Sequence, residues 1–148
     1  MREDNNTILI VEDQILNRRI LRNMIQNDYD LLEAENGAEA LNILQNYSEE
    51  ITAILLDIVM PVMDGYEFLK RIKETLWKDI PIIVMTGDND ADTEEKALEL
   101  GAWDFVIKPY KARILLTRLK NAIARRGMAV FKSFYQFGTN QKFYACVD

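Results

Sequence analysis

Residues 51–57 of the chain read ITAILLD, a run of apolar residues that ends in an acid. The run is shorter than an ordinary helix and consists mainly of branched aliphatic residues, a composition typical of a strand buried on both faces. Asp57 therefore stands where a predicted strand ends. The same pattern, a short apolar strand followed at once by polar side chains, recurs along the sequence.

Four further short runs show this strand pattern: 7–11 (TILIV), 31–34, 81–86 (PIIVMT) and 103–107. The segments that follow the strands carry apolar residues at helical spacing. In the first of these segments, Leu16, Ile20 and Met24 form the predicted apolar stripe. The predicted helices lie over 14–27 and 37–46, around 66–72 and 97–100, and over 111–126.

Strands and helices thus alternate strictly along the chain. Each right-handed crossover between parallel strands places its helix on one face of the sheet, so both faces become covered. The predicted fold class is α/β, with a five-stranded parallel sheet flanked by five helices in a flavodoxin-like (βα)5 three-layer sandwich.

Composition narrows the classes of function. A chain of 148 residues fits one domain, and its single cysteine, Cys146, excludes an internal disulfide. No run approaches the roughly 18 apolar residues of a membrane span, and the net charge of −6 gives no electrostatic footprint for nucleic acid. We therefore expect a cytoplasmic protein that neither binds nucleic acid directly nor enters a membrane.

The sequence contains no histidine. This absence removes Ser-His and Cys-His nucleophiles and histidine metal ligands. In an open parallel sheet, sites lie beyond the carboxyl ends of the strands. The polar residues at these predicted strand ends are Glu12, Asp13, Asp57, Thr86 and Lys108.

Three carboxylates at one rim repel one another, so a divalent cation is expected, and hard oxygen ligands suit Mg²⁺. Glu12 and Asp13 fit a metal-holding pair, and Asp57 fits a nucleophile that attacks a phosphoryl group. Lys108 would neutralise phosphoryl oxygens, and the Thr86 hydroxyl could move toward one of them and act as a switch.

Taken singly, these residues have ordinary alternative roles; Glu12 and Asp13, for example, could cap the following helix. Their joint appearance at four strand ends favours the catalytic interpretation. The Lys108-Pro109 peptide bond is predicted to be cis, which costs only about 0.5–1 kcal/mol before proline, because the turn must aim the lysine inward.

Four motifs resemble those of the receiver domain family of bacterial two-component response regulators: ILIVEDQ (8–14), LLDIVMPVMDG (55–65), VMTGD (84–88) and GAWDFVIKPY (101–110). The resemblance covers nearly all of residues 5–126. It implies that Asp57 accepts a phosphoryl group that Thr86 and Lys108 contact. It also implies a Mg²⁺ site formed by Glu12, Asp13, Asp57 and the backbone carbonyl of Val59.

The resemblance extends to the switch and its regulation. Phe105 stands at the position of the family's switch aromatic, which is expected to turn inward when Thr86 moves. Val59 and Asp88 occupy positions expected to tune dephosphorylation. Tyr110 stands where phenylalanine is usual, a departure expected to leave the chemistry unchanged.

The resemblance further implies a partner that donates the phosphoryl group. Because the chain has no histidine, the donor must be a separate sensor histidine kinase or phosphotransfer protein. The fourth helix, fifth strand and fifth helix would form the reporting surface, through which a homodimer could assemble. No enzymatic activity is expected beyond the domain's own phosphorylation and dephosphorylation.

Three alternatives remain open at the level of sequence. The chain could be the receiver part of a longer protein, such as a cyclic-dinucleotide enzyme or a hybrid kinase. An aspartyl-phosphate phosphatase would need Asp-x-Asp, but Val59 stands at the second position. Flavodoxin-like cofactor binding would need a phosphate-binding loop after the first strand, where Glu12 and Asp13 would repel phosphate instead.

The C-terminal segment 127–148 is rich in aromatic residues and shows no clear helical or alternating pattern. We expect the receiver to occupy residues 1–126 and the remainder to be a linker remnant or non-native sequence. An interaction segment that packs on a partner is the alternative, since clustered exposed aromatic residues often mark a binding surface.

Overall fold

Five parallel strands pair in the order β2-β1-β3-β4-β5 in the computed structural model. The structure describes residues 6–60, 62–87 and 91–139, and side chains as far as residue 128. The strands are β1 (Thr7–Val11), β2 (Asp30–Ala34), β3 (Ile51–Asp57), β4 (Ile82–Thr86) and β5 (Asp104–Ile107). Their ends agree with the predicted runs to within one residue.

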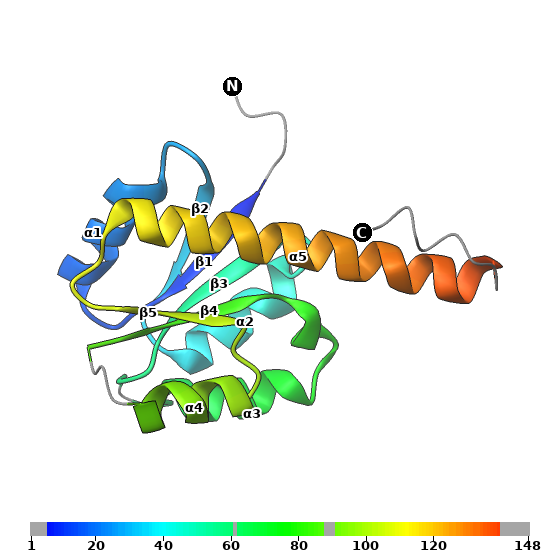
Figure 1. Cartoon of the computed structure of the whole chain (residues 1–148). Coiled ribbons are helices and arrows are strands. Elements are labelled where there is room, and N and C mark those ends of the chain that lie inside the picture. The colour runs from blue at the N-terminus through cyan, green and yellow to red at the C-terminus, as the bar shows by residue number, and fades with distance from the viewer. Residues whose placement is uncertain (1–5, 61, 88–90, 140–148) are drawn as a thin grey trace.

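Helices cover both faces of this sheet (Figure 1). They are α1 (Ile15–Ile25), α2 (Gly37–Tyr47), α3 (Gly65–Lys73), α4 (Ala91–Glu99) and α5 (Ala112–Thr139), with a short 3-10 helix, η1 (Leu76–Asp79). Helices α1 and α5 pack on one face, and α2, α3 and α4 on the other. The predicted flavodoxin-like three-layer sandwich is therefore confirmed.

Strand β1 shows why the sheet needs helices on both sides. Successive side chains of a strand point to opposite faces. Ile8 and Ile10 accordingly join the core beneath α1 and α5, whereas Leu9 and Val11 join the core beneath α2 and α3. All four are fully buried, as expected for a central strand of a parallel sheet.

The predicted apolar stripe of α1 is wrong. Leu16 is 67% exposed and Ile20 is 45% exposed, whereas Leu21 and Ile25 are fully buried. Only Met24 of the predicted stripe packs, partly buried, against the core. Two apolar series run along this helix with the same spacing of four, so spacing alone could not decide which of them faces the sheet.

Helix α5 continues beyond its predicted end at Arg126. The Arg126 guanidinium donates hydrogen bonds to the carbonyl oxygens of Ile51 and Thr52, at 3.2 and 3.3 Å. Beyond this contact the helix runs past the sheet as far as Thr139 (Figure 1). The predicted end of this helix at Arg126 is therefore wrong, and residues 140–148 lie outside the described part of the chain.

A helix that is already formed explains this extension. Adding a residue to an existing helix gains one hydrogen bond for each residue fixed, whereas starting a new helix is costly. Despite its length, α5 is not apolar enough to span a membrane, and neither is any other helix in the described ranges.

Candidate phosphorylation and metal site

The predicted site residues meet at the carboxyl edge of the sheet. Strands β1, β3, β4 and β5 are neighbours in that order. Each predicted polar residue is either the last residue of one of these strands or lies just after it. Asp57 ends β3 beside Met85, and Thr86 ends β4 beside Ile107. Parallel pairing therefore brings together side chains that are far apart in the sequence.

Three carboxylates form the centre of this site. One oxygen from each of Glu12, Asp13 and Asp57 lies within 4.8 Å of the others. Glu12 is fully buried, Asp57 is 3% exposed, and Asp13 is half-buried. The capping alternative is not supported, because the residue that precedes α1 is Gln14 and no side chain caps that helix end.

Glu12 has two unlike carboxylate oxygens. Its Oε1 accepts a hydrogen bond from Asn17 Nδ2 at 2.8 Å. Its Oε2 is buried, and no hydrogen-bond donor reaches it within the described residues. Burial, and then the adjacent Asp57 carboxylate, raise the pKa of Glu12 to about 7, although the Asn17 hydrogen bond acts in the opposite direction. A buried acceptor of this kind is satisfied by a proton or a cation.

This raised pKa predicts a pH dependence. Between the ordinary pKa of 4.5 and the folded value of about 7, the metal-free folded protein binds more protons than the unfolded chain. The stability that Glu12 contributes is therefore full below about pH 4.5 and is lost as the pH rises through about 7. The affinity for Mg²⁺ should instead increase as the pH rises, because the cation must displace the proton from Glu12.

Titration calorimetry with Mg²⁺ checks this prediction. We expect the apparent affinity to be about tenfold lower near pH 6 than near pH 8. Glu12→Gln serves as the control: it should bind more weakly and lose most of the pH dependence. An affinity of the wild-type protein that does not change over this range would contradict the assignment.

Lys108 adds a cation to the other side of the Asp57 carboxylate. Its Nζ lies 3.2 Å from Asp57 Oδ1, and its side chain is 27% exposed. The backbone N–H of Lys108 donates to the carbonyl oxygen of Thr86 at 2.8 Å, which ties the start of this loop to the end of β4. The following Lys108-Pro109 bond is cis, as predicted.

The remaining predicted residues occupy different surroundings. The Val59 backbone N–H donates to Asp57 Oδ1 at 3.4 Å, and the Val59 side chain is 80% exposed. Phe105 is partly buried against the core beneath α2 and α3. Asp88, which was expected to tune dephosphorylation, lies outside the described residues.

Sequence reasoning missed two residues near the acids and gave no role to a third. Asn17 bonds Glu12, and Arg18 contacts the backbone of the same loop. No sequence pattern pointed to Asn17 and Arg18, since they lie on α1 and contact the loop before that helix only in the folded structure. Tyr110 is the third: its buried hydroxyl lacks a partner in the described part of the chain, and burial together with Glu12 and Asp57 raises its pKa.

The donor set fits Mg²⁺. Carboxylate oxygens are the ligands that this cation prefers in proteins, and it usually binds through a few of them while retaining water molecules. Among the described residues, no donor reaches the buried Glu12 Oε2, and one oxygen of each of the three acids lies within 4.8 Å of the others. The cluster therefore has both the chemistry and the burial of a divalent cation site.

Comparison with known proteins identifies the family. Residues 8–120 match the model of the response regulator receiver domain. The chain is 37% identical over 123 residues to the phosphate regulon transcriptional regulatory protein PhoB of Pseudomonas aeruginosa, covering 82% of this chain and 53% of that protein. It is 34% identical over 125 residues to a histidine kinase of Formosa agariphila, covering 84% of this chain and 9% of the kinase.

A solved structure shows a similar arrangement. The receiver domain of a sensor histidine kinase from Pseudomonas aeruginosa, which has a magnesium ion coordinated in its active site cleft, superposes with a TM-score of 0.72 at 28% identity. The match covers 79% of this chain and 96% of that domain. The acid cluster described above resembles such a site. The chain therefore belongs to the response regulator receiver domain family, whose members act as signalling switches and are not classical enzymes.

Proposed function

We propose that the chain accepts a phosphoryl group on Asp57 from a phosphohistidine of a sensor kinase or phosphotransfer protein, and so switches a signalling output. One observation carries this proposal. Asp57 belongs both to the acid cluster and to the ion pair with Lys108, so its carboxylate lies where a cation and an ammonium group can both reach a phosphoryl group.

The proposed reaction is a phosphoryl transfer to a carboxylate. An oxygen of Asp57 attacks phosphorus, the P–N bond of the donor breaks, and the imidazole leaves with the electron pair and takes up a proton. Lys108 balances charge on the phosphoryl oxygens, and Thr86 donates a hydrogen bond to one of them. Mg²⁺ held by Glu12, Asp13, Asp57 and the Val59 carbonyl would supply further charge stabilisation.

A small-molecule phosphodonor tests the proposal directly. Incubation with acetyl phosphate and Mg²⁺ should add the mass of one phosphoryl group, as measured by intact mass spectrometry. A chelator should prevent this gain, because without the cation the acid cluster carries excess negative charge that repels the incoming phosphate. A protein that gains no phosphoryl group with Mg²⁺ present would contradict the proposed function.

The partner that donates the phosphoryl group needs a docking surface beside Asp57. Four large apolar side chains are exposed in the segments that follow the site acids: Ile15, Leu16, Val59 and Val62. Exposed apolar residues that gather on one surface commonly mark a protein interface. We propose that they contact the donor while its histidine reaches Asp57.

Leu16→Glu tests this docking surface. We expect transfer from a phosphorylated histidine phosphotransfer protein to slow by about tenfold, because a charge replaces an apolar contact. Phosphorylation by acetyl phosphate should stay at the wild-type rate. Leu76→Glu is the matched control, since Leu76 is 96% exposed on η1, away from the site acids in the sequence. Equal slowing of both reactions by Leu16→Glu would contradict a docking role.

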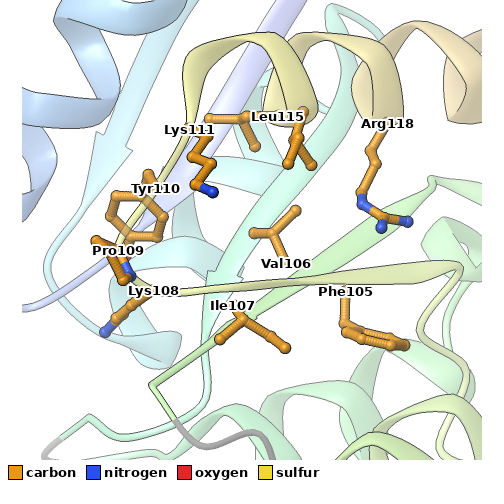
Figure 2. A pocket seen from close by; sticks show the side chains of 10 residues that line it. Phe105, Val106, Ile107, Lys108, Pro109, Tyr110, Lys111, Leu115 and Arg118 are labelled. Atoms are coloured by element: carbon orange, nitrogen blue, oxygen red, sulfur yellow. The ribbon is translucent and has the colours of Figure 1, made fainter.

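The proposed output surface lies on α4, β5 and α5. Figure 2 shows Val106 directed toward Leu115 of α5, whereas Phe105 and Ile107 point to the other side of β5. A pocket of about 310 Å³ lies between β5 and α5, with Lys111 among its lining residues. We propose that movement of Thr86 and Phe105 reshapes this surface, where a homodimer or another partner would bind.

Two further proposals concern the whole protein. The receiver unit is residues 1–126, a boundary supported by the contact of Arg126 with the start of β3. The remaining segment is a linker or non-native sequence. The chain spans about half the length of PhoB and 9% of the kinase, so its role within a longer protein is the second candidate. The single cysteine and the proposed donor fit a cytoplasmic location.

A further inference from the structure

We propose that Arg18 is a positioning residue that holds the loop after β1 in the shape that binds the cation. This inference rests on the proposed function, since it concerns the same metal site. Arg18 lies on α1, and its hydrogen bonds to the loop after β1 go to backbone carbonyls and not to the three carboxylates. It acts on the backbone that carries two of them.

The Arg18 guanidinium bridges two successive peptide groups. Its Nη1 donates to the carbonyl oxygen of Glu12 at 2.8 Å and to that of Asp13 at 3.3 Å. Rotation of either peptide would turn the attached side chains away from Asp57. From its other side, the loop is held by the backbone N–H of Glu12, which donates to the carbonyl oxygen of Ala34 at 3.0 Å.

Arg18 is itself held in place by acids on and after β2. Its Nε lies 3.3 Å from Glu33 Oε1, and its Nη2 lies 3.9 Å from Glu35 Oε1. Arg22, one turn further along α1, also pairs with Glu33. The Arg18 side chain is only 11% exposed and that of Glu33 is 21% exposed, so this pair is shielded from solvent better than ordinary surface pairs. The guanidinium is planar and has several N–H donors, so it can contact the loop carbonyls and these acids at the same time.

This arrangement solves a specific electrostatic problem. The acids must stay close together although they repel one another, and Lys108 already pairs with Asp57. A second cation that paired directly with the oxygens of Glu12 or Asp13 would compete with the metal. Arg18 places its positive charge on the loop carbonyls instead, which leaves the carboxylate oxygens of Glu12 and Asp13 available. Removal of a group that orients metal ligands without contacting the metal commonly lowers the metal affinity by about 10–100-fold.

The test compares Mg²⁺ binding by Arg18→Gln, Arg18→Lys and a charge-matched control. Arg19→Gln removes the same charge one position along, where the side chain is exposed. Binding is measured by titration calorimetry without any phosphodonor, and the unfolding temperature is measured in chelator. The rate of phosphorylation by acetyl phosphate is then followed as a function of Mg²⁺ concentration.

We expect Arg18→Gln to raise the Mg²⁺ dissociation constant by about tenfold or more. The phosphorylation rate at saturating Mg²⁺ should stay near that of the wild type, since the reacting groups are unchanged. Arg18→Lys keeps the charge but loses the several N–H donors of the guanidinium, so its Mg²⁺ dissociation constant should lie between those of the wild type and Arg18→Gln. Arg19→Gln should bind as the wild type does.

A dissociation constant unchanged in Arg18→Gln, or raised equally in Arg19→Gln, would overturn the proposal. So would a lower unfolding temperature with unchanged Mg²⁺ affinity, which would indicate a purely structural role. If Arg18→Gln does not fold, Mg²⁺ binding by Glu33→Gln is compared with that of the wild type instead, because this substitution removes the ion pair of Arg18 Nε. A wild-type protein that binds no Mg²⁺ would instead refute the metal site of the proposed function.

Discussion

Asp57→Asn is expected to abolish covalent phosphorylation by acetyl phosphate and Mg²⁺. The amide lacks the nucleophilic carboxylate oxygen that would form the acyl phosphate. The substitution preserves the shape of a side chain that is 3% exposed, and it removes one of three mutually repelling charges, so the fold should persist. Intact mass should show no gain in the variant under conditions in which the wild-type protein gains one phosphoryl group.

Asp64→Asn provides the matched control for this loss. The Asp64 side chain caps α3 by accepting a hydrogen bond from the backbone N–H of Glu67 at 2.9 Å. Asparagine caps helices about as well as aspartate, so this variant should fold and become phosphorylated like the wild type. Phosphorylation of Asp57→Asn at the wild-type rate would show that another side chain is the acceptor.

Gly65→Ala is expected to destabilise the domain by about 3 kcal/mol, because overpacking against a rigid neighbour is costly. A Cβ atom at this position would lie 2.7 Å from the carbonyl oxygen of Asp57 and 2.7 Å from Ile58 Cα. Both are backbone atoms and cannot swing aside like a flexible side chain. The Gly65 backbone N–H also donates to the carbonyl oxygen of Ile58 at 2.9 Å, which fixes the start of α3 against the end of β3.

Urea denaturation of Gly65→Ala and Gly127→Ala measures this effect. Gly127 lies within α5, and an added Cβ would meet no atom within 4 Å. The same substitution there should raise the free energy of unfolding by about 0.5–1 kcal/mol, since alanine favours the helix. The same glycine-to-alanine substitution is therefore expected to lower the free energy of unfolding at position 65 and to raise it at position 127. A Gly65→Ala protein as stable as the wild type would show that the end of β3 can move away from α3.

The same close approach links stability to the site. Asp57 is the residue whose carbonyl oxygen an alanine at position 65 would displace. Movement of that peptide would shift the carboxylate relative to Lys108 Nζ, which lies 3.2 Å away. A surviving Gly65→Ala protein should therefore also become phosphorylated more slowly than the wild type.

Much of the fold could be predicted because strands of a parallel sheet are recognisable locally. The runs 7–11 and 51–57 are mainly apolar, since their aliphatic side chains are buried on both faces of the sheet, and turns and polar residues bound them. The alternation with helices then required a parallel sheet, and parallel strands bring their carboxyl ends to one edge. For this reason the cluster of Glu12, Asp13 and Asp57 was predictable without coordinates.

Other features depended on contacts between distant segments, which local spacing does not encode. On α1, two apolar series had equal spacing, and packing against the sheet selected Leu21 and Ile25. The extension of α5 to Thr139 reflects propagation of a helix that had already formed. Neither result follows from the sequence of the segment alone.

By itself, the sequence determined the class of fold, the edge of the sheet that carries the site, and the acids that occupy it. Only the tertiary structure determined how those acids are held: Lys108 against Asp57, Asn17 against Glu12, and Arg18 against the loop backbone. The physical reason is one of range. Hydrophobic periodicity acts over a few residues, whereas the charge and hydrogen-bond contacts that shape a site join whichever side chains the folded sheet brings together.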